Sequence, residues 1–299
     1  MQVIDISTNG TTAIAPQIAT LLREDYYINI HTVEASAISS FTAMRVASEL
    51  KKNAADVIIC HRRKDLLGAI GARKLAPSER RDFKIIYAPA TIDDIEANIT
   101  EAYAKEIAAT VLPAQLSYPR HCTVIEPGCL TETTVTKAAE APAGGPLNIV
   151  WAGPIDEEQR LWRLIRAVAA QSTGQYAIHV YGTGPARSVM PIVKGSRTMT
   201  NLNITWHGDE PTLDQALAEA HLGAETHTIV RQPEMVMRRL GIPVLDTADS
   251  ESLSDTLTRV ADDRGTLGDM RRHAKEEYEE RFNPKTTARN WQRLLTSLI

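Results

Sequence analysis

Three short apolar runs in the second half of the chain constrain its fold more than any other feature. They read NIVWAG at 148–153, AIHVYG at 177–182 and NITWHG at 203–208, and each ends in glycine. A helical pattern follows the first two runs, an alternation that is typical of a parallel sheet with helical crossovers. Ligands bind such sheets at the carboxyl ends of the strands. The sequence therefore predicts ligand-binding groups close to the glycines that end these runs.

The same alternation of strand and helix extends through the whole chain. Short runs of β-branched and aromatic residues favour strands, whereas apolar residues at spacings of three and four favour helices. We expect strands at 2–6, 27–33, 56–60, 84–87, 108–112, 123–125, 147–151, 177–181, 203–207, 222–225 and 243–246. We expect helices at 15–24, 42–52, 65–74, 93–106, 157–169, 186–194, 212–220, 233–240, 252–262, 267–281 and 285–297.

The alternation stops once, which divides the chain. Residues 137–146 are rich in Ala, Pro and Gly and show no periodicity, as is typical of a linker. The expected fold class is α/β, with one Rossmann-like doubly wound domain at 1–136 and a second at 147–299, facing each other across a cleft. The last helix is expected to pack back on the N-terminal domain. Such a cleft is the default ligand site.

Charge and cysteine content exclude several classes of protein. The 299 residues carry 33 basic and 37 acidic side chains, and the net charge of −4 gives no general attraction to nucleic acid or to an anionic membrane. Three cysteines without a Cys-x-x-Cys pair are typical of a reduced compartment. The sequence shows no signal-peptide pattern and no run of about 18 apolar residues. We expect a cytoplasmic protein without a nucleic-acid partner and with at most peripheral membrane association.

Residues 147–299 resemble the donor domain of GT-B glycosyltransferases, in particular the retaining family 4. The segment 177–185 is similar to that family's G-x-G-P turn after a strand, 204–208 to its V-x-F-x-G, and 240–244 to the G-x-P-V that closes its donor site. The first half fits more loosely. The resemblance implies a glycosyltransferase of the hexosyltransferase type. It would transfer a sugar from a nucleotide-diphosphate sugar to an acceptor hydroxyl with retention, and without a metal ion or other cofactor.

The resemblance also implies where substrates bind, with the donor on the second domain and the acceptor on the first. The donor set comprises Gly153, Arg160, Gly182, Thr183, Gly184, Arg187, Glu225, Thr226, His227 and Thr228. The acceptor set comprises Asn9, Gly10, Thr11 and Arg62, and the candidates for catalytic groups are His61 and Glu234. Each has a structural alternative. The paired glycines also suit close packing, the polar side chains of 225–230 also suit caps, and the cations of 61–64 also suit a solvated loop.

Four positions depart from the family pattern. Pro154 and Gln159 stand where the family has the Arg and Lys that hold the donor pyrophosphate, and Thr228 and Val236 stand where it has paired glutamates. Without a metal ion, the charge of the departing pyrophosphate must be stabilised by Arg, Lys, backbone N–H groups or helix N-termini. Arg160, one residue beyond the expected lysine, is the nearest substitute.

Two alternatives to an active transferase remain open. A non-catalytic GT-B module that binds a partner protein or a carbohydrate would not need the pyrophosphate-binding cations. A nucleotide-sugar epimerase-like enzyme would share the architecture but would need a histidine and an acid paired in the cleft. The sequence has no metal-ligand spacing, so we expect no metal site. The expected partners are a nucleotide sugar and a carbohydrate or glycosylated acceptor, with a protein partner or a second copy of the chain as further candidates.

Overall fold

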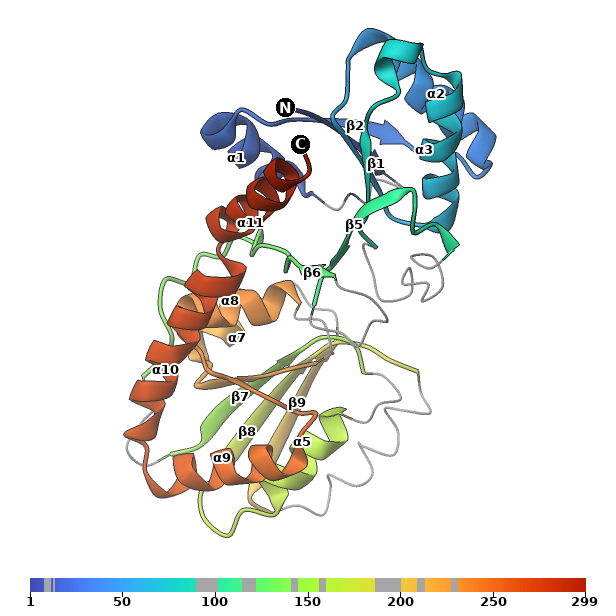
Figure 1. Ribbon diagram of the computed structural model, residues 1–299. Helices are drawn as coiled ribbons and strands as arrows, with labels where there is room; N and C mark the ends of the chain where they lie inside the picture. The colour runs from blue at the N-terminus through green and yellow to red at the C-terminus, as the bar shows by residue number, and fades with distance from the viewer. Residues whose placement is uncertain are drawn as a thin grey trace. The chain divides into compact units, whose positions relative to one another are not determined.

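The computed structural model (Figure 1) describes residues 1–7, 12, 14–89, 102–114, 122–140, 145–155, 160–185, 200–208, 213–226 and 231–299. The chain forms two compact units. Unit 1 comprises Met1–Gly128 together with Asn283–Ile299, and unit 2 comprises Cys129–Phe282.

Unit 1 is built on a six-stranded parallel sheet with the strand order β2-β1-β3-β4-β5-β6. Its elements are β1 (Gln2–Ser7), α1 (Pro16–Tyr26), β2 (Asn29–Glu34), α2 (Ser39–Lys52), β3 (Val57–Cys60), α3 (Arg63–Leu75), η1 (Ser78–Arg80), β4 (Lys84–Tyr87), β5 (Ile107–Leu112), β6 (Thr123–Val124) and α11 (Pro284–Ser297). Helices α2 and α3 pack side by side on one face of the sheet, and α11 packs against α1 (Figure 1). The strand order reverses direction between β1 and β3, which makes this pair the topological switch point of the sheet.

Unit 2 is built on a five-stranded parallel sheet with the strand order β11-β10-β7-β8-β9. Its elements are β7 (Leu147–Ala152), α5 (Arg160–Ala169), β8 (Tyr176–Tyr181), β9 (Leu202–Gly208), α7 (Leu213–Glu219), β10 (Leu222–Ala224), α8 (Gln232–Leu240), β11 (Val244–Leu245), α9 (Ser250–Asp262), α10 (Thr266–Glu277) and the π-helical turn η3 (Tyr278–Phe282). Alternate residues of β7 and β8 pack against α5 and α9 on one face and against α7 and α8 on the other. Both faces are thus covered, as parallel sheets require.

The expected α/β class with two parallel sheets is confirmed, and the described elements lie close to their expected bounds. The helix expected at 186–194 lies outside the described residues, as does most of the one expected at 93–106. The helix expected at 267–281 is interrupted, because α10 ends at Glu277 and the π-helical turn follows.

The division between the units falls at Gly128, earlier than the linker expected at 137–146. Residues 129–140 belong to unit 2 because they bond to its helices. The Thr133 hydroxyl donates to the Asp214 carboxylate at 2.7 Å, and the buried Ala138 donates its N–H to the carbonyl of Leu240.

Candidate functional site

Two glycine loops meet at the carboxyl edge of the unit 2 sheet. The N–H of Gly153, after β7, donates to the carbonyl of Tyr181, and the N–H of Gly182, after β8, donates to the carbonyl of Gly208. A Cβ on Gly182 would lie 1.8 Å from the carbonyl oxygen of Gly153, and one on Gly184 would lie 2.0 Å from that of Ile155. Both contacts are far shorter than any side chain tolerates. These glycines are therefore required for the backbones of the two loops to pack against each other.

Thr226, which follows β10, joins the two glycine loops. A Cβ on Gly153 would lie 2.4 Å from the Thr226 hydroxyl oxygen. Thr226 is fully buried, and both its N–H and its hydroxyl donate to Oε1 of Glu234, at 2.7 and 2.8 Å. Oε2 of Glu234 accepts the N–H of Arg231 at 3.1 Å. Burial raises the pKa of Glu234, although these three donors act in the opposite direction. The carboxylate thus ties Thr226, just after β10, to the start of α8.

Glu225 is also held by the protein. Its Oε1 accepts from Nη2 of Arg238 at 2.9 Å, while Nε of Arg238 donates to Oε2 of Glu277 at 2.6 Å. Burial raises the pKa of Glu225, and the Arg238 guanidinium partly offsets this effect. Arg238 itself is buried and stacks over the ring of Phe282. Sequence reasoning did not single out Arg238, although an arginine one helical turn after Glu234 lies on the same face of α8.

The remaining donor candidates divide into three groups. Thr183 and Gly184 are exposed at the carboxyl edge, where a ligand can reach them. Arg160 is the first residue of α5 and is buried on the same side of that helix as Leu164. Arg187, His227 and Thr228 lie outside the described residues.

In unit 1 the catalytic candidate His61 lies at the switch point. It follows β3, is buried, and has an acceptor at each ring nitrogen. Nδ1 lies 2.7 Å from the carbonyl oxygen of Ala88, and Nε2 lies 2.8 Å from Oδ1 of Asp5 in β1. A carbonyl and an ionised carboxylate only accept, so this geometry favours a hydrogen on both nitrogens, which is the imidazolium form. Burial lowers the pKa of His61, but the hydrogen bond and charge of Asp5 outweigh it, and the pKa is raised.

Asp5 was not anticipated as a partner of His61. The signal was present as an acid between the apolar residues Ile4 and Ile6 of β1, because a buried carboxylate needs a partner. Its second oxygen accepts the N–H of Ile14 at 3.2 Å. The sequence alternative of an ordinary solvated loop does not hold for His61, which is only 2% exposed.

The acceptor candidate Arg62 adjoins this pair. Its N–H donates to Oδ2 of Asp65 at 3.1 Å, which caps α3. Nη2 of Arg62 is buried without a hydrogen-bond partner among the described residues. Asn9, Gly10 and Thr11 lie outside the described residues.

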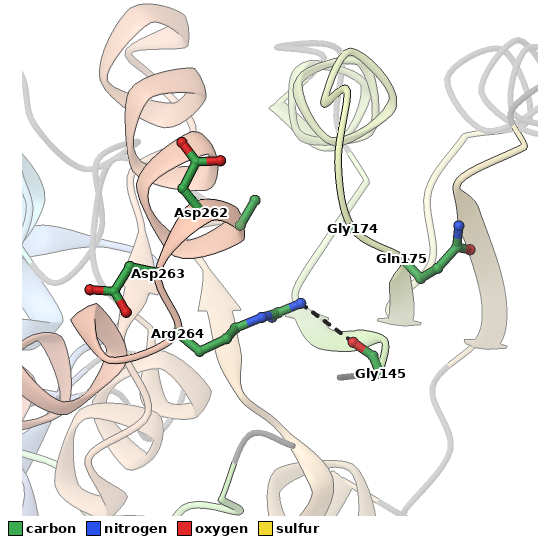
Figure 2. Close-up of a pocket in the computed structure, with 7 residues that line it drawn as sticks. Gly145, Gly174, Gln175, Asp262, Asp263 and Arg264 are labelled. Carbon is green, nitrogen blue, oxygen red and sulfur yellow. Dashed lines mark hydrogen bonds between the residues drawn. The ribbon is translucent and has the colours of Figure 1, made fainter. Parts of the chain in front are cut away.

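A cavity of about 560 Å³ lies at the other end of the unit 2 sheet, before β7 and β8. It is lined by Gly145, Gly174, Gln175, 261–263 and Arg264, and Figure 2 shows Arg264 reaching across to the carbonyl of Gly145. This is the amino edge of a parallel sheet, opposite to the edge at which ligands bind such folds. The cavity therefore does not serve as the donor site.

Among the described residues, no group of three or more His, Cys, Asp and Glu side chains is placed to hold a metal ion. His179 and His207 do meet, with Nδ1 and Nε2 3.2 Å apart, and the ring of His207 stacks on Tyr181. No helix among the residues that the structure describes is long and apolar enough to cross a bilayer.

The sequence matches no protein-family model and no curated protein. Solved structures match it over almost the whole length. The lipopolysaccharide outer core galactosyltransferase WaaB in its apo form is 13% identical, with a TM-score of 0.69 and 100% of both chains covered. HepE of Anabaena in complex with UDP-glucose is 14% identical, with a TM-score of 0.64 and 99% of this chain and 100% of that one covered.

The chain has the GT-B fold. Sucrose-phosphate synthase from Thermosynechococcus elongatus shares it as well, at 12% identity and a TM-score of 0.63, with 99% of this chain and 98% of that one covered. The resemblance of the C-terminal half to GT-B glycosyltransferases is therefore confirmed, and at the level of structure it extends to the N-terminal half. At these identities the similarity establishes the architecture alone.

Proposed function

We propose that the protein is a glycosyltransferase that takes a sugar from a nucleotide-diphosphate donor bound at the carboxyl edge of unit 2. The observation that carries the proposal is the meeting of the loops after β7, β8 and β10 at that edge, in a chain that matches GT-B enzymes along its full length. HepE, one of the matching proteins, has been solved with UDP-glucose. The ligand-binding end of a parallel sheet and the proposed donor site thus coincide.

The donor site would consist largely of backbone groups. The glycine loops bring the ends of β7 and β8 together. Gly153 and Gly182 donate their own N–H groups to carbonyls within the protein, so Thr183 and Gly184 form the part that a ligand can reach. The N-terminus of α5 would supply partial positive charge to a pyrophosphate, whereas that of α8 already holds the Glu234 carboxylate. Arg160, at the start of α5, is the proposed cation in place of the family's Arg and Lys, and Arg187, His227 and Thr228 remain donor candidates. In this proposal transfer requires no metal ion.

Glu225, Thr226 and Glu234 are then framework residues. Thr226 and Glu234 bond to each other, and Glu225 is paired with Arg238, so these side chains position the loop rather than react. His61 is poorly suited to be a general base, because each of its ring nitrogens faces an acceptor within the protein. The acceptor hydroxyl, which we place at the carboxyl edge of unit 1 beside Arg62, would lose its proton to the departing phosphate, as the retaining mechanism implies.

A non-catalytic GT-B module is the second candidate. It is favoured because the carboxylates of Glu225 and Glu234, near the proposed donor site, are already bonded to other protein groups. Pro154, in place of the family's arginine, also favours it. Such a module would retain the fold and bind a carbohydrate or a protein without cleaving a nucleotide sugar.

Thermal unfolding with a panel of nucleotides separates the two candidates. UDP, ADP, GDP and TDP, and their common hexose conjugates, would each be tested with magnesium and with a chelator. A ligand at one hundred times its Kd adds about 2.7 kcal/mol of stability, enough to move the Tm by several degrees. The proposal expects one nucleotide family to raise the Tm equally under both conditions. If no nucleotide raises the Tm at millimolar concentration, the non-catalytic module is supported. A rise that needs the metal would refute a metal-independent donor site.

A further inference from the structure

His179 and His207 bring two imidazole rings together on one face of the unit 2 sheet. Nδ1 of His179 in β8 lies 3.2 Å from Nε2 of His207 in β9, and both residues are partly exposed. They are 28 positions apart in sequence, so no local spacing signals the pair. Imidazole nitrogens are the commonest metal ligands in proteins, and here two of them face each other within reach of solvent.

An irregularity in the strand pairing aims His207 at His179. Strands β8 and β9, which lie side by side in Figure 1, pair in parallel register until Tyr181. Tyr181 pairs with Gly208, which leaves His207 as an extra residue, as in a β-bulge. A bulge redirects the side chain that it carries. The ring of His207 also stacks on that of Tyr181, with centroids 4.2 Å apart and planes 2° apart, and this contact fixes its orientation.

The separation of the two facing nitrogens suits a shared metal ion. Two nitrogens that bind one tetrahedral ion at about 2.0–2.1 Å lie about 3.3 Å apart, close to the 3.2 Å between these two. Without an ion, the same two nitrogens share one hydrogen, because a neutral imidazole has one donor and one acceptor nitrogen. A metal ion would take the place of that hydrogen, which moves to the other nitrogen of its own ring. Two neutral rings therefore bind the ion without a net release of protons.

The charges around the pair favour a cation. Burial lowers the pKa of His179, and the neighbouring His207 lowers it further, so the ring of His179 is neutral at neutral pH. A neutral imidazole is the form that binds metal. Glu219, at the end of α7, acts on this pKa in the opposite direction. Its negative charge would also attract a bound cation.

We propose that His179 and His207 bind a divalent transition-metal ion, with water completing its coordination. Imidazole ligands suit Zn²⁺, Ni²⁺ and Cu²⁺, whereas Mg²⁺ and Ca²⁺ take oxygen ligands. The ion would join the edge strand β9 to β8 near the carboxyl edge of the sheet. It is not required for sugar transfer, and the inference does not rest on the proposed function.

Calorimetric titration of zinc chloride into the full-length protein, in a buffer that does not bind metal ions, tests the proposal. Wild type should bind Zn²⁺, and excess magnesium chloride should not compete. His179→Gln and His207→Gln should each weaken binding at least about tenfold, because a lone imidazole lacks the high effective concentration of a second ligand. Glutamine can still form a hydrogen bond with the remaining ring, so both variants should keep the fold. His273→Gln is the matched control, since it removes an exposed imidazole of α10 and should bind like wild type.

His207→Cys tests whether the ion touches position 207. A thiolate is also a ligand for such ions, so this variant should bind Co²⁺ and gain the near-ultraviolet charge-transfer absorption of a thiolate–cobalt bond, which wild type should lack. A purely structural role of His207 cannot produce that absorption. The proposal is overturned if wild type does not bind Zn²⁺ at micromolar concentrations, or if His179→Gln and His207→Gln bind as tightly as wild type. It is also overturned if His273→Gln loses as much affinity as they do, or if His207→Cys with Co²⁺ gives no new absorption.

Discussion

Removal of the His61 side chain tests the buried ion pair of unit 1. His61→Leu keeps a similar volume but leaves the fully buried Asp5 carboxylate, among the described residues, with the N–H of Ile14 as its remaining donor. It also leaves the carbonyl of Ala88 without its donor. A buried charge that loses its partner costs about 3–5 kcal/mol, so this variant should lose that much stability at about pH 6. Asp5→Asn combined with His61→Leu should cost at least about 2 kcal/mol less than the sum of the single changes.

The pH dependence supplies a sharper criterion. The pKa of His61 is raised in the folded protein, so the imidazolium contributes its full stability below the unfolded pKa of about 6.5. That contribution is lost as pH rises through the folded pKa, and the cost of His61→Leu should shrink there. The assay is urea unfolding at several pH values, read by hydrogen exchange in β1 and β3, because these strands report unit 1 alone. A cost below about 1 kcal/mol, or one that grows with pH, would refute the imidazolium assignment.

Four substitutions in unit 2 test the framework around the proposed donor site. All are read from urea midpoints of tryptophan fluorescence in a Trp291→Phe background, which leaves Trp151, Trp162 and Trp206 of unit 2. Gly153→Ala should cost about 1–3 kcal/mol, since its Cβ would lie 2.4 Å from the Thr226 hydroxyl. Gly208→Asn is its control and should cost about 1 kcal/mol or less, because that glycine has φ +64° and open space around it. Arg238→Met removes the counter-ion of two carboxylates and should cost about 3–5 kcal/mol. Glu234→Gln should cost about 1–3 kcal/mol. Both carboxylate oxygens accept backbone N–H groups, from Thr226 and Arg231, so the side-chain NH2 of glutamine would face one of these donors. Equal costs for Gly153→Ala and Gly208→Asn would contradict the close packing of Gly153 on Thr226. Stability changes within about 0.5 kcal/mol for Arg238→Met or Glu234→Gln would contradict the bonds described for these two side chains.

The architecture was largely predictable because its signals are local. The strand expected at 84–87 is β4 at the same bounds, and the glycines after β7 and β8 occur where strand-end turns were expected. Periodicity and glycine placement depend on nearby residues, so a single sequence carries them. The two-sheet α/β class follows from repeating that pattern.

The partners of the site residues were less predictable, because they come from distant parts of the chain. Nothing near His61 shows that Asp5 lies beside it, since that contact depends on β1 and β3 being neighbours. Thr226 and Glu234 were both selected as site residues, but their mutual bond depends on how α8 packs beside β10. The buried position of Arg160 likewise depends on which side of α5 faces the sheet.

The central claim is that nucleotides bind at the carboxyl edge of unit 2, and calorimetric titration of a nucleoside diphosphate tests it most directly. UDP, ADP, GDP and TDP would be titrated into wild type, Thr183→Glu and Thr205→Glu. Both threonines are exposed, but Thr183 lies in the β8 loop at the proposed phosphate site, whereas Thr205 lies within β9. A new carboxylate beside the pyrophosphate should weaken binding at least about tenfold, or 1.4 kcal/mol. We expect one nucleotide to bind wild type and Thr205→Glu equally and Thr183→Glu more weakly. No binding to wild type, or equal binding to all three proteins, would contradict it.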